Sequence, residues 1–115
     1  MFLTAQMLTS SENGLTTAAK HVKLFSSLTR SLAVQYGSKK VRANAICPGP
    51  VLTPMMETLF ASEAEKMKRL NRIPLGRFGR AEDIVAAGVF LASDESSWMT
   101  GQNFVIDGGI TVNYF

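Results

Sequence analysis

The spacing of apolar residues predicts an amphipathic helix in the first third of the chain. Phe25, Leu28, Leu32 and Tyr36 recur at intervals of three and four residues, and Gly37 follows them. Such intervals place side chains on one face of a helix, and a glycine after the last of them is a common stop. We therefore expect a helix that ends at Tyr36.

Two later stretches alternate as strands do. The segment "KVRANAIC" carries apolar residues on both faces, so we expect a buried strand over 41–47. Asn44 is polar within it, and a buried amide needs partners, which favours structural hydrogen bonds over a chemical role. The segment "QNFVIDGG" is a second strand ended by two glycines, and residues 6–10 are a third candidate.

Two further helices are predicted between these strands. Ser62, followed three residues later by Glu65, has the spacing of a capping box and opens a helix that carries Met67 and Leu70. Residues 81–93 begin with acids and are then apolar almost all round, which predicts a helix packed on more than one side. The order of helices and strands indicates an α/β fold with a parallel sheet.

Composition narrows the class of protein. The chain has 115 residues, 46% of them apolar and 18% charged, which is typical of one soluble globular domain. Its net charge of +3 includes one basic cluster without interleaved aromatic residues, so we expect a solvated helix face and no nucleic-acid partner. That cluster consists of Lys66, Lys68, Arg69 and Arg72. We also expect packing roles for Trp98 and the methionines.

The cysteine count, the apolar runs and the first residues bear on the cellular compartment of the protein. The single Cys47 excludes an internal disulfide and suits a reducing compartment. No apolar run reaches the length of a membrane span, and the first residues lack the basic start of a signal peptide. We therefore expect a cytoplasmic protein without membrane contact, and we expect no metal site.

Two long segments resemble a known family. The stretches "LTRSLAVQYGSKKVRANAICPGPVLTPM" and "IPLGRFGRAEDIVAAGVFLASDESSWMTGQNFVIDGG" are similar to the carboxy-terminal half of a short-chain dehydrogenase/reductase, almost continuously over 28–109. The resemblance implies the carboxy-terminal part of a Rossmann-like doubly wound parallel sheet, incomplete in this chain. Residues 1–115 would then form part of an NAD(P)-binding domain, with 1–24 atypical.

The resemblance also implies a cofactor site for NAD or NADP. Pro48, Gly49 and Val51 would line the nicotinamide, with the Val51 backbone meeting its carboxamide, and Thr53 would reach the amide or a phosphate. The glycine between two prolines offers rigid backbone that a flat ring can approach closely. The alternative is that the segment is only a stiff loop. None of the 9 glycines forms the Gly-x-x-x-Gly-x-Gly cluster that would hold the pyrophosphate, so at least half of the cofactor site is expected to be absent.

The family's catalytic residues are serine, tyrosine and lysine. The segment "SSENGL" resembles the serine motif and gives Ser11 that role, and Lys20 is the candidate lysine. Counting from Lys20 places Thr16 at the tyrosine position. Counting back from "LTRSLA" places Val22 and Ala18 at the lysine and tyrosine positions instead. Both counts lack the tyrosine, whose proton transfer is worth roughly 10²–10⁴-fold in rate. We expect the chain alone to be inactive.

One hypothesis for this loss lies in the gene. The codons needed for residues 15–20, read two bases later, permit Tyr-Asn-Ser-Ser-Lys, which contains the missing Tyr-x-x-x-Lys. A frameshift or a mis-spliced start would therefore explain why 1–24 depart from the family pattern.

The resemblance further implies a substrate and partners. Met56, Leu59 and Phe60 fall where the family has a mobile substrate lid, which indicates a hydrophobic or mixed alcohol or carbonyl substrate. Family members pair through helices that this chain contains, so we expect a homo-oligomer or association with a full-length relative. The alternative function is a non-catalytic interaction module that docks on such a relative. An open, apolar sheet edge is expected to limit solubility or to promote oligomerisation.

Overall fold

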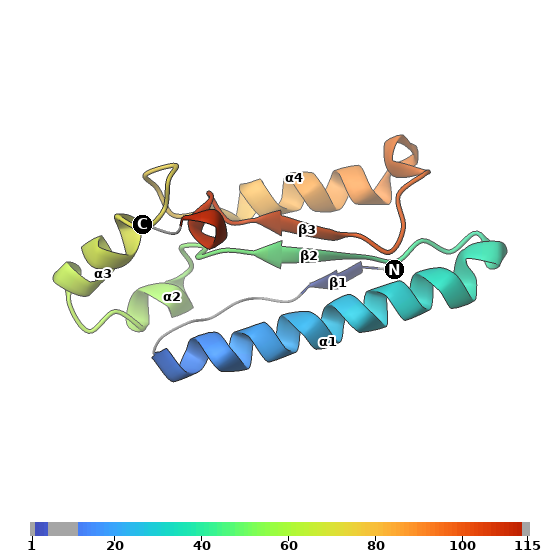
Figure 1. The fold of residues 1–115 in the computed structure, drawn as a ribbon. Helices are drawn as coiled ribbons and strands as arrows, with labels where there is room; N and C mark the ends of the chain where they lie inside the picture. Colours follow the sequence, from blue (N-terminus) through green and yellow to red (C-terminus); the bar gives the residue numbers. More distant parts are fainter. Residues whose placement is uncertain (1, 5–11, 114–115) are drawn as a thin grey trace.

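A three-stranded parallel sheet lies between two long helices in the computed structural model of the protein (Figure 1). The structure describes residues 2–4 and 12–113, with side chains from residue 23 onward. The strands are β1 (Phe2–Thr4), β2 (Asn44–Pro48) and β3 (Asn103–Ile106), in the order β1-β2-β3. Helices α1 (Glu12–Tyr36) and α4 (Ala81–Ala92) both contact β2, the central strand. The predicted α/β fold with a parallel sheet is confirmed.

Smaller elements lie at the ends of the sheet. Helices α2 (Pro54–Thr58) and α3 (Glu63–Leu70) follow β2 and lie beyond its carboxyl end (Figure 1). Short 3₁₀ turns follow α1, α4 and β3 at Gly37–Lys39, Asp94–Ser96 and Ile110–Val112.

The core is centred on β2. Its Ile46 is 4% exposed and faces α4, since a Cβ on Gly88 of that helix would lie 4.0 Å from the Ile46 Cδ1. Side chains alternate along a strand, so the buried Ala45 faces the α1 side, where Thr29 is also buried. Parallel sheets normally have both faces covered, and β2 follows that rule.

The core is thin away from β2. The radius of gyration is 15.5 Å, against about 13 Å for a compact chain of this length. Large apolar residues are exposed on both long helices, among them Leu24, Val34, Val85 and Val89. None of the helices described combines the length and apolar character that a membrane crossing requires.

A polar junction ties the segment just before β2 to the end of α4. The Arg42 guanidinium donates hydrogen bonds to the carbonyls of Leu91 (2.8 Å) and Ser93 (3.2 Å), and to the Ser96 hydroxyl (2.9 Å). The last carbonyls of a helix have no partner within the helix, and a cation there also favours the helix dipole. Arg42 therefore caps α4 from the segment just before β2.

Asn44 fixes the connection from α4 to β3. Its Nδ2 donates to the Met99 carbonyl at 2.9 Å, and its Oδ1 accepts from the Gln102 N–H at 3.1 Å. The side chain is 1% exposed, so both polar ends are satisfied inside the protein. The predicted structural role of Asn44 is confirmed.

The strand expected over 41–47 begins three residues later than predicted. Ala43 hydrogen-bonds with the connection before β3 instead of with the ladder: its N–H donates to the Thr100 hydroxyl (3.1 Å), and its carbonyl accepts from the Gly101 N–H (2.6 Å). The Arg42 side chain is hydrogen-bonded to the end of α4. Alternation in the sequence continues through these residues, but their hydrogen bonds go elsewhere.

Predictions for the helix ends agree well with the structure. Helix α1 ends at Tyr36 as predicted, although the left-handed residue of this turn is Lys40 (φ 59°) and not Gly37. At α3, the Ser62 hydroxyl accepts from the Glu65 N–H at 3.2 Å, while the Glu65 carboxylate accepts from Ala61. The capping box is thus present with its return bond displaced by one residue.

Three other expectations differ from the structure or lie outside it. Helix α4 is not packed on several sides among the residues described, because Val85 and Val89 are 60% and 64% exposed. Trp98 does not pack either, since its side chain is 99% exposed. The candidate strand at 6–10 lies outside the described residues, and β1 at Phe2–Thr4 was missed because three residues carry too little pattern.

The junction at Arg42 predicts a measurable loss of stability on substitution. Arg42→Met should lower the free energy of unfolding by about 2–4 kcal/mol, because several buried carbonyls lose a charged donor. Arg42→Lys should lose part of this, since one ammonium cannot span the same acceptors. Urea denaturation measures the effect, with Arg30→Met on the exposed side of α1 as the control. Equal midpoints for Arg42→Met and Arg30→Met would contradict this role.

Candidate functional site

A tight turn follows β2 at the carboxyl end of the sheet, where ligands of open parallel sheets bind. The Gly49 N–H donates to the Ile106 carbonyl of β3 at 2.9 Å. A Cβ on Gly49 would lie 2.5 Å from the Asp107 Cα and 2.6 Å from its Cβ. The glycine is therefore required by packing against the end of β3, a reason that the sequence pattern did not reveal.

Val51 is held against a second loop. The Leu52 N–H donates to the Gly79 carbonyl (2.9 Å), and the Gly79 N–H donates to the Pro50 carbonyl (3.0 Å). These two bonds form a parallel bridge between Val51 and Gly79, in which the N–H and C=O of Val51 itself point away from Gly79. Val51 is 7% exposed, and no hydrogen bond to its backbone N–H or C=O is found within the described part of the chain.

The two other candidate cofactor residues have structural positions. Pro48 is buried as the last residue of β2 and pairs with Ile106. Thr53 is the N-cap of α2, where its hydroxyl accepts from the Met56 N–H at 3.1 Å. That hydroxyl retains a donor for a further partner, because a Thr hydroxyl both accepts and donates.

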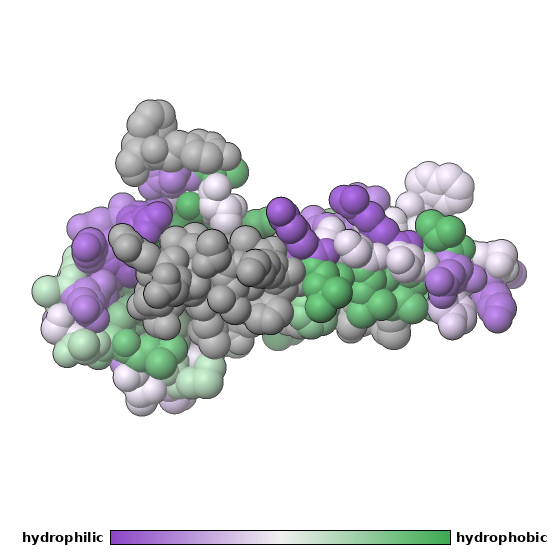
Figure 2. Space-filling model, turned by 60° about the horizontal axis from the view of Figure 1, so that its bottom comes forward, coloured by the Kyte–Doolittle hydropathy of each residue, from purple (hydrophilic) through white to green (hydrophobic). Residues whose placement is uncertain are grey.

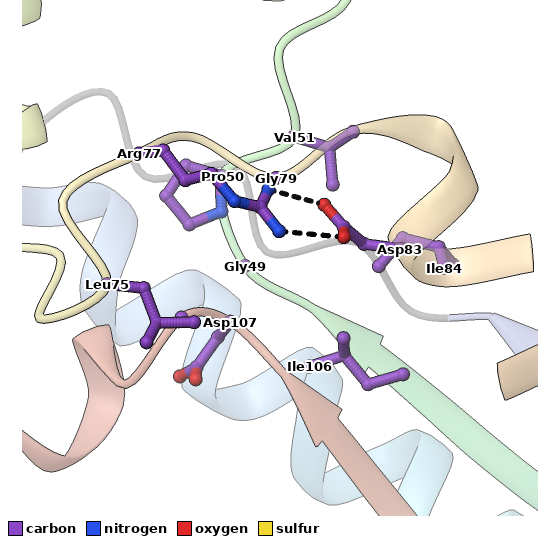
Figure 3. Close-up of a pocket in the computed structure, with 11 residues that line it drawn as sticks. Gly49, Pro50, Val51, Leu75, Arg77, Gly79, Asp83, Ile84, Ile106 and Asp107 are labelled. Carbon is purple, nitrogen blue, oxygen red and sulfur yellow. Dashed lines mark hydrogen bonds and ion pairs between the residues drawn. The ribbon is translucent and has the colours of Figure 1, made fainter. Parts of the chain in front are cut away.

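Gly49 and Val51 share a small cavity of about 100 Å³ with residues from the 75–79 loop, α4 and the end of β3 (Figure 3). Small-molecule pockets usually measure roughly 300–1,000 Å³, so this cavity alone is too small for a dinucleotide. Its other lining residues are Pro50, Leu75, Arg77, Gly79, Asp83, Ile84, Ile106, Asp107 and Gly108. Sequence reasoning missed Arg77 and Asp83. The available signal was Asp83, an acid three residues after the N-cap Arg80 of α4.

An ion pair closes one side of the cavity. The Arg77 guanidinium donates to both Asp83 carboxylate oxygens, at 2.7 and 2.8 Å, and Asp83 also accepts from the Arg80 N–H at 2.7 Å (Figure 3). These contacts, above all the hydrogen bonds from the Arg77 side chain, hold the pKa of Asp83 well below its ordinary value. The carboxylate therefore caps the first turn of α4 and fixes the 75–79 loop beside Val51.

The Asp107 carboxylate stabilises the turn after β3. Burial raises the pKa of Asp107, but hydrogen bonds from the Thr111 hydroxyl (2.5 Å) and the Gly109 and Thr111 N–H groups outweigh burial, so that its pKa is lowered overall. Figure 3 shows this carboxylate pointing away from the Arg77–Asp83 pair. Asp107 is thus an ionised turn residue.

Cys47, a free cysteine, lies in β2 just before the turn. Burial raises the pKa of its thiol. A thiol with a raised pKa stays protonated near neutral pH and is a weak nucleophile. Cys47 is therefore a packing residue of β2.

The catalytic candidates fall on α1 and just before it. Ser11 lies outside the described residues. Lys20 lies within α1, whose backbone is described there. Positions 18 and 22 continue the spacing of the buried side of the helix, on which Phe25 is half-buried and Thr29 has no exposed surface. Positions 16 and 20 continue the spacing of Lys23, Ser27 and Arg30, which are exposed.

The three lid candidates have different environments. Met56 is 2% exposed, whereas Leu59 is 47% exposed. The Phe60 ring packs against Phe78, with ring centroids 5.7 Å apart at an angle of 52°. Met56 therefore belongs to the core, Leu59 is open to solvent, and Phe60 is packed on Phe78.

Comparison with known proteins places this geometry in a family. The family model described as Enoyl-(Acyl carrier protein) reductase matches residues 2–111. The chain is 48% identical over 89 residues to a Bacillus subtilis (strain 168) protein described as a 2,4-dienoyl-CoA reductase, covering 76% of this chain and 35% of that protein. It is 45% identical over 85 residues to a Thermotoga maritima 3-oxoacyl-(acyl-carrier-protein) reductase, covering 74% and 34%.

Solved structures of related proteins share the fold of this chain. A structure from Agrobacterium tumefaciens with bound NADP, described as a 2-deoxy-d-gluconate 3-dehydrogenase, superposes with a TM-score of 0.80 at 36% identity. The match covers 96% of this chain and 46% of that one. The chain spans about a third of the length of the curated relatives above. From the family match and the shared fold, the chain belongs to the short-chain dehydrogenase/reductase family.

Proposed function

We propose that the chain is the carboxy-terminal part of an NAD(P)-dependent oxidoreductase that acts on alcohols or carbonyl compounds, and that it does not catalyse the reaction by itself. The turn from Pro48 to Val51 would line the nicotinamide, with Thr53 beside it. The observation that carries the proposal is made at Val51: the residue is 7% exposed, and its backbone N–H and C=O have no hydrogen-bond partner among the described residues. Backbone N–H and C=O groups in folded proteins are nearly always paired, so two groups without a protein partner beside a cavity support a ligand there.

The chain's own residues fit one end of the cofactor. A carboxamide offers one acceptor and two donors, which complement the N–H and C=O of Val51. When bound, the nicotinamide supplies the hydride acceptor or donor. The cavity of about 100 Å³ cannot enclose the rest of a dinucleotide, and the chain lacks a glycine-rich cluster for the pyrophosphate. The remaining contacts must come from the part of the family fold that this chain does not contain.

Catalysis would need a proton donor that the sequence lacks. On α1, positions 18 and 22 hold Ala18 and Val22, which carry no titratable group. Thr16 and Lys20 include one lysine, but an alkyl hydroxyl is too weak an acid to replace a phenol. The contribution of this chain is therefore binding and orientation at the nicotinamide end, with Met56, Leu59 and Phe60 near the substrate.

The role of the Val51 N–H can be tested in a fusion that supplies the missing half. The fusion joins the part of the Agrobacterium relative that precedes its counterpart of β1 ahead of Phe2 of this chain. In this fusion, Val51→Pro should weaken NADPH binding about five- to tenfold, because one hydrogen bond is lost. Val51→Ile keeps the N–H and should bind as the parent does. NADPH fluorescence measures the affinity. Equal affinities for the two variants would contradict a hydrogen bond from the Val51 N–H to the cofactor.

The helix phase predicts which positions restore proton transfer. In the same fusion, Ala18→Tyr combined with Val22→Lys should raise turnover by roughly 10²–10⁴-fold, since both positions continue the buried side of α1. Thr16→Tyr, which creates a Tyr-x-x-x-Lys with Lys20, should not, because these positions continue the exposed side. NADPH oxidation with a panel of ketones measures both, with the unmodified relative as positive control. Greater turnover for Thr16→Tyr would reverse the alignment.

The alternative function is a non-catalytic module that docks on a full-length relative or pairs with itself. Exposed apolar side chains favour it: Val85 and Val89 on α4 are 60% and 64% exposed, and Val105 on β3 is 56% exposed. Size-exclusion chromatography of the chain with the full-length Agrobacterium relative should then show a mixed species. Val85→Glu combined with Val89→Glu should abolish it, whereas Lys23→Glu on α1 should not. Two independent peaks would count against this alternative.

A further inference from the structure

The segment from Leu52 to Gly79 leaves the sheet and returns to it at one place. This segment, the 52–79 excursion, follows the turn after β2, carries α2 and α3, and ends just before α4. At its base the Leu52 N–H donates to the Gly79 carbonyl (2.9 Å), and the Gly79 N–H donates to the Pro50 carbonyl (3.0 Å). The two bonds lie on either side of Val51. The base of the excursion is therefore also the frame of the candidate cofactor turn.

Few buried side chains hold the excursion in place. Met56, Ile73 and Phe78 are buried, whereas other large apolar side chains are exposed, among them Met55, Leu59, Met67 and Leu75. Figure 2 shows hydrophilic side chains beside apolar ones at the end of the molecule that α2 and α3 form. Apolar packing thus gives the excursion few anchors, so the polar contacts at its base matter for its position.

An ion pair spans that base. Arg77, two residues before Gly79, donates to both carboxylate oxygens of Asp83, at 2.7 and 2.8 Å, and to the Phe78 carbonyl at 3.1 Å. The same carboxylate accepts from the Arg80 N–H at 2.7 Å, which fixes it on the first turn of α4. Figure 3 shows the pair beside the turn that follows β2. Because a bidentate pair restricts geometry, Gly79 is held between Arg77 and an anchored helix start.

The exposure of this pair indicates a local effect. The Arg77 and Asp83 side chains are 48% and 31% exposed, and ion pairs at such exposure contribute little to the stability of a whole protein. Glu82 also lies in the first turn of α4, where a negative charge favours the helix dipole. No contact from Glu82 to the loop is found in the described part of the chain. Loss of the pair should therefore loosen the base of the excursion and leave the core intact.

We propose that Arg77 and Asp83 are positioning residues for the nicotinamide end of the cofactor site. By closing the base of the 52–79 excursion, they keep Gly79 bonded on both sides of Val51. This arrangement leaves the Val51 N–H and C=O directed away from the loop and open to a ligand. Arg77 and Asp83 act through Gly79 and not on the reacting atoms. The identity of the ligand rests on the proposed function, whereas the coupling between the ion pair and the bridge does not.

Amide hydrogen exchange of the 115-residue chain, followed by NMR, tests this coupling without a ligand. Asp83→Asn removes the charge but keeps an oxygen that can accept from the Arg80 N–H. It should speed exchange at the Leu52 and Gly79 amides roughly tenfold and leave the Ala45 amide, which is bonded within the sheet, unchanged.

Matched variants separate positioning from general stability. Glu82→Gln removes a charge from the same helical turn and should change none of these rates. Asp83→Glu keeps the charge and should restore slow exchange at the bridge. Arg77→Lys, which lacks the paired donors, should loosen the bridge less than Asp83→Asn does, and it keeps the test open if that variant does not fold. Unchanged bridge amides in Asp83→Asn, or an equal increase at Ala45, would overturn the positioning role.

NADPH titration of the same variants in the fusion described above links the bridge to binding. Asp83→Asn should weaken NADPH binding about three- to tenfold, while Asp83→Glu and Glu82→Gln should bind as the parent does. Parent-like affinity in Asp83→Asn, despite a loosened bridge, would refute positioning and leave the cofactor assignment intact. A parent fusion that binds no NADPH would instead refute the proposed function, and the exchange rates would still decide whether the ion pair holds the bridge.

Discussion

The guanidinium of Arg42 is the contact on which the described fold most depends. It reaches from the segment just before the central strand to the last carbonyls of α4 and to the buried hydroxyl of Ser96. Two residues later, Asn44 holds the connection that leads into β3. These two side chains set where α4 ends and where β3 begins. The turn at the other end of β2 depends on that placement, because Gly49 packs against the end of β3.

The site at the carboxyl end of the sheet combines rigidity with one unused pair of backbone groups. Gly49 is hydrogen-bonded to β3, Gly79 is hydrogen-bonded to Pro50 and Leu52 on either side of Val51, and the Arg77–Asp83 pair secures the adjoining loop. Within this frame the Val51 N–H and C=O have no partner among the residues described. The geometry suits an amide-bearing ring at one end of a larger ligand. This chain has no glycine-rich turn that would bind the pyrophosphate of such a ligand.

Much of the fold was predictable from the sequence because helix ends and strands carry strong local signals. Tyr36 as the end of α1, Ser62 as a cap, and the parallel α/β order all follow from periodicity and capping residues. The start of β2 was not predictable, because Arg42 and Ala43 obey strand alternation while their hydrogen bonds go to residues 49 and 57 positions away, at Leu91 and Thr100. The packing role of Gly49 and the exposure of Trp98 likewise depend on neighbours that are distant in sequence.

The central claim is that this chain supplies one end of a cofactor site and needs the rest of the family fold to bind the cofactor. NADPH fluorescence, titrated into the 115-residue chain and into its fusion with the missing half, tests this most directly. The account predicts no enhancement or blue shift with the chain alone up to about 1 mM, and saturable enhancement with the fusion. Saturable binding by the chain alone, or none by a folded fusion, would contradict it.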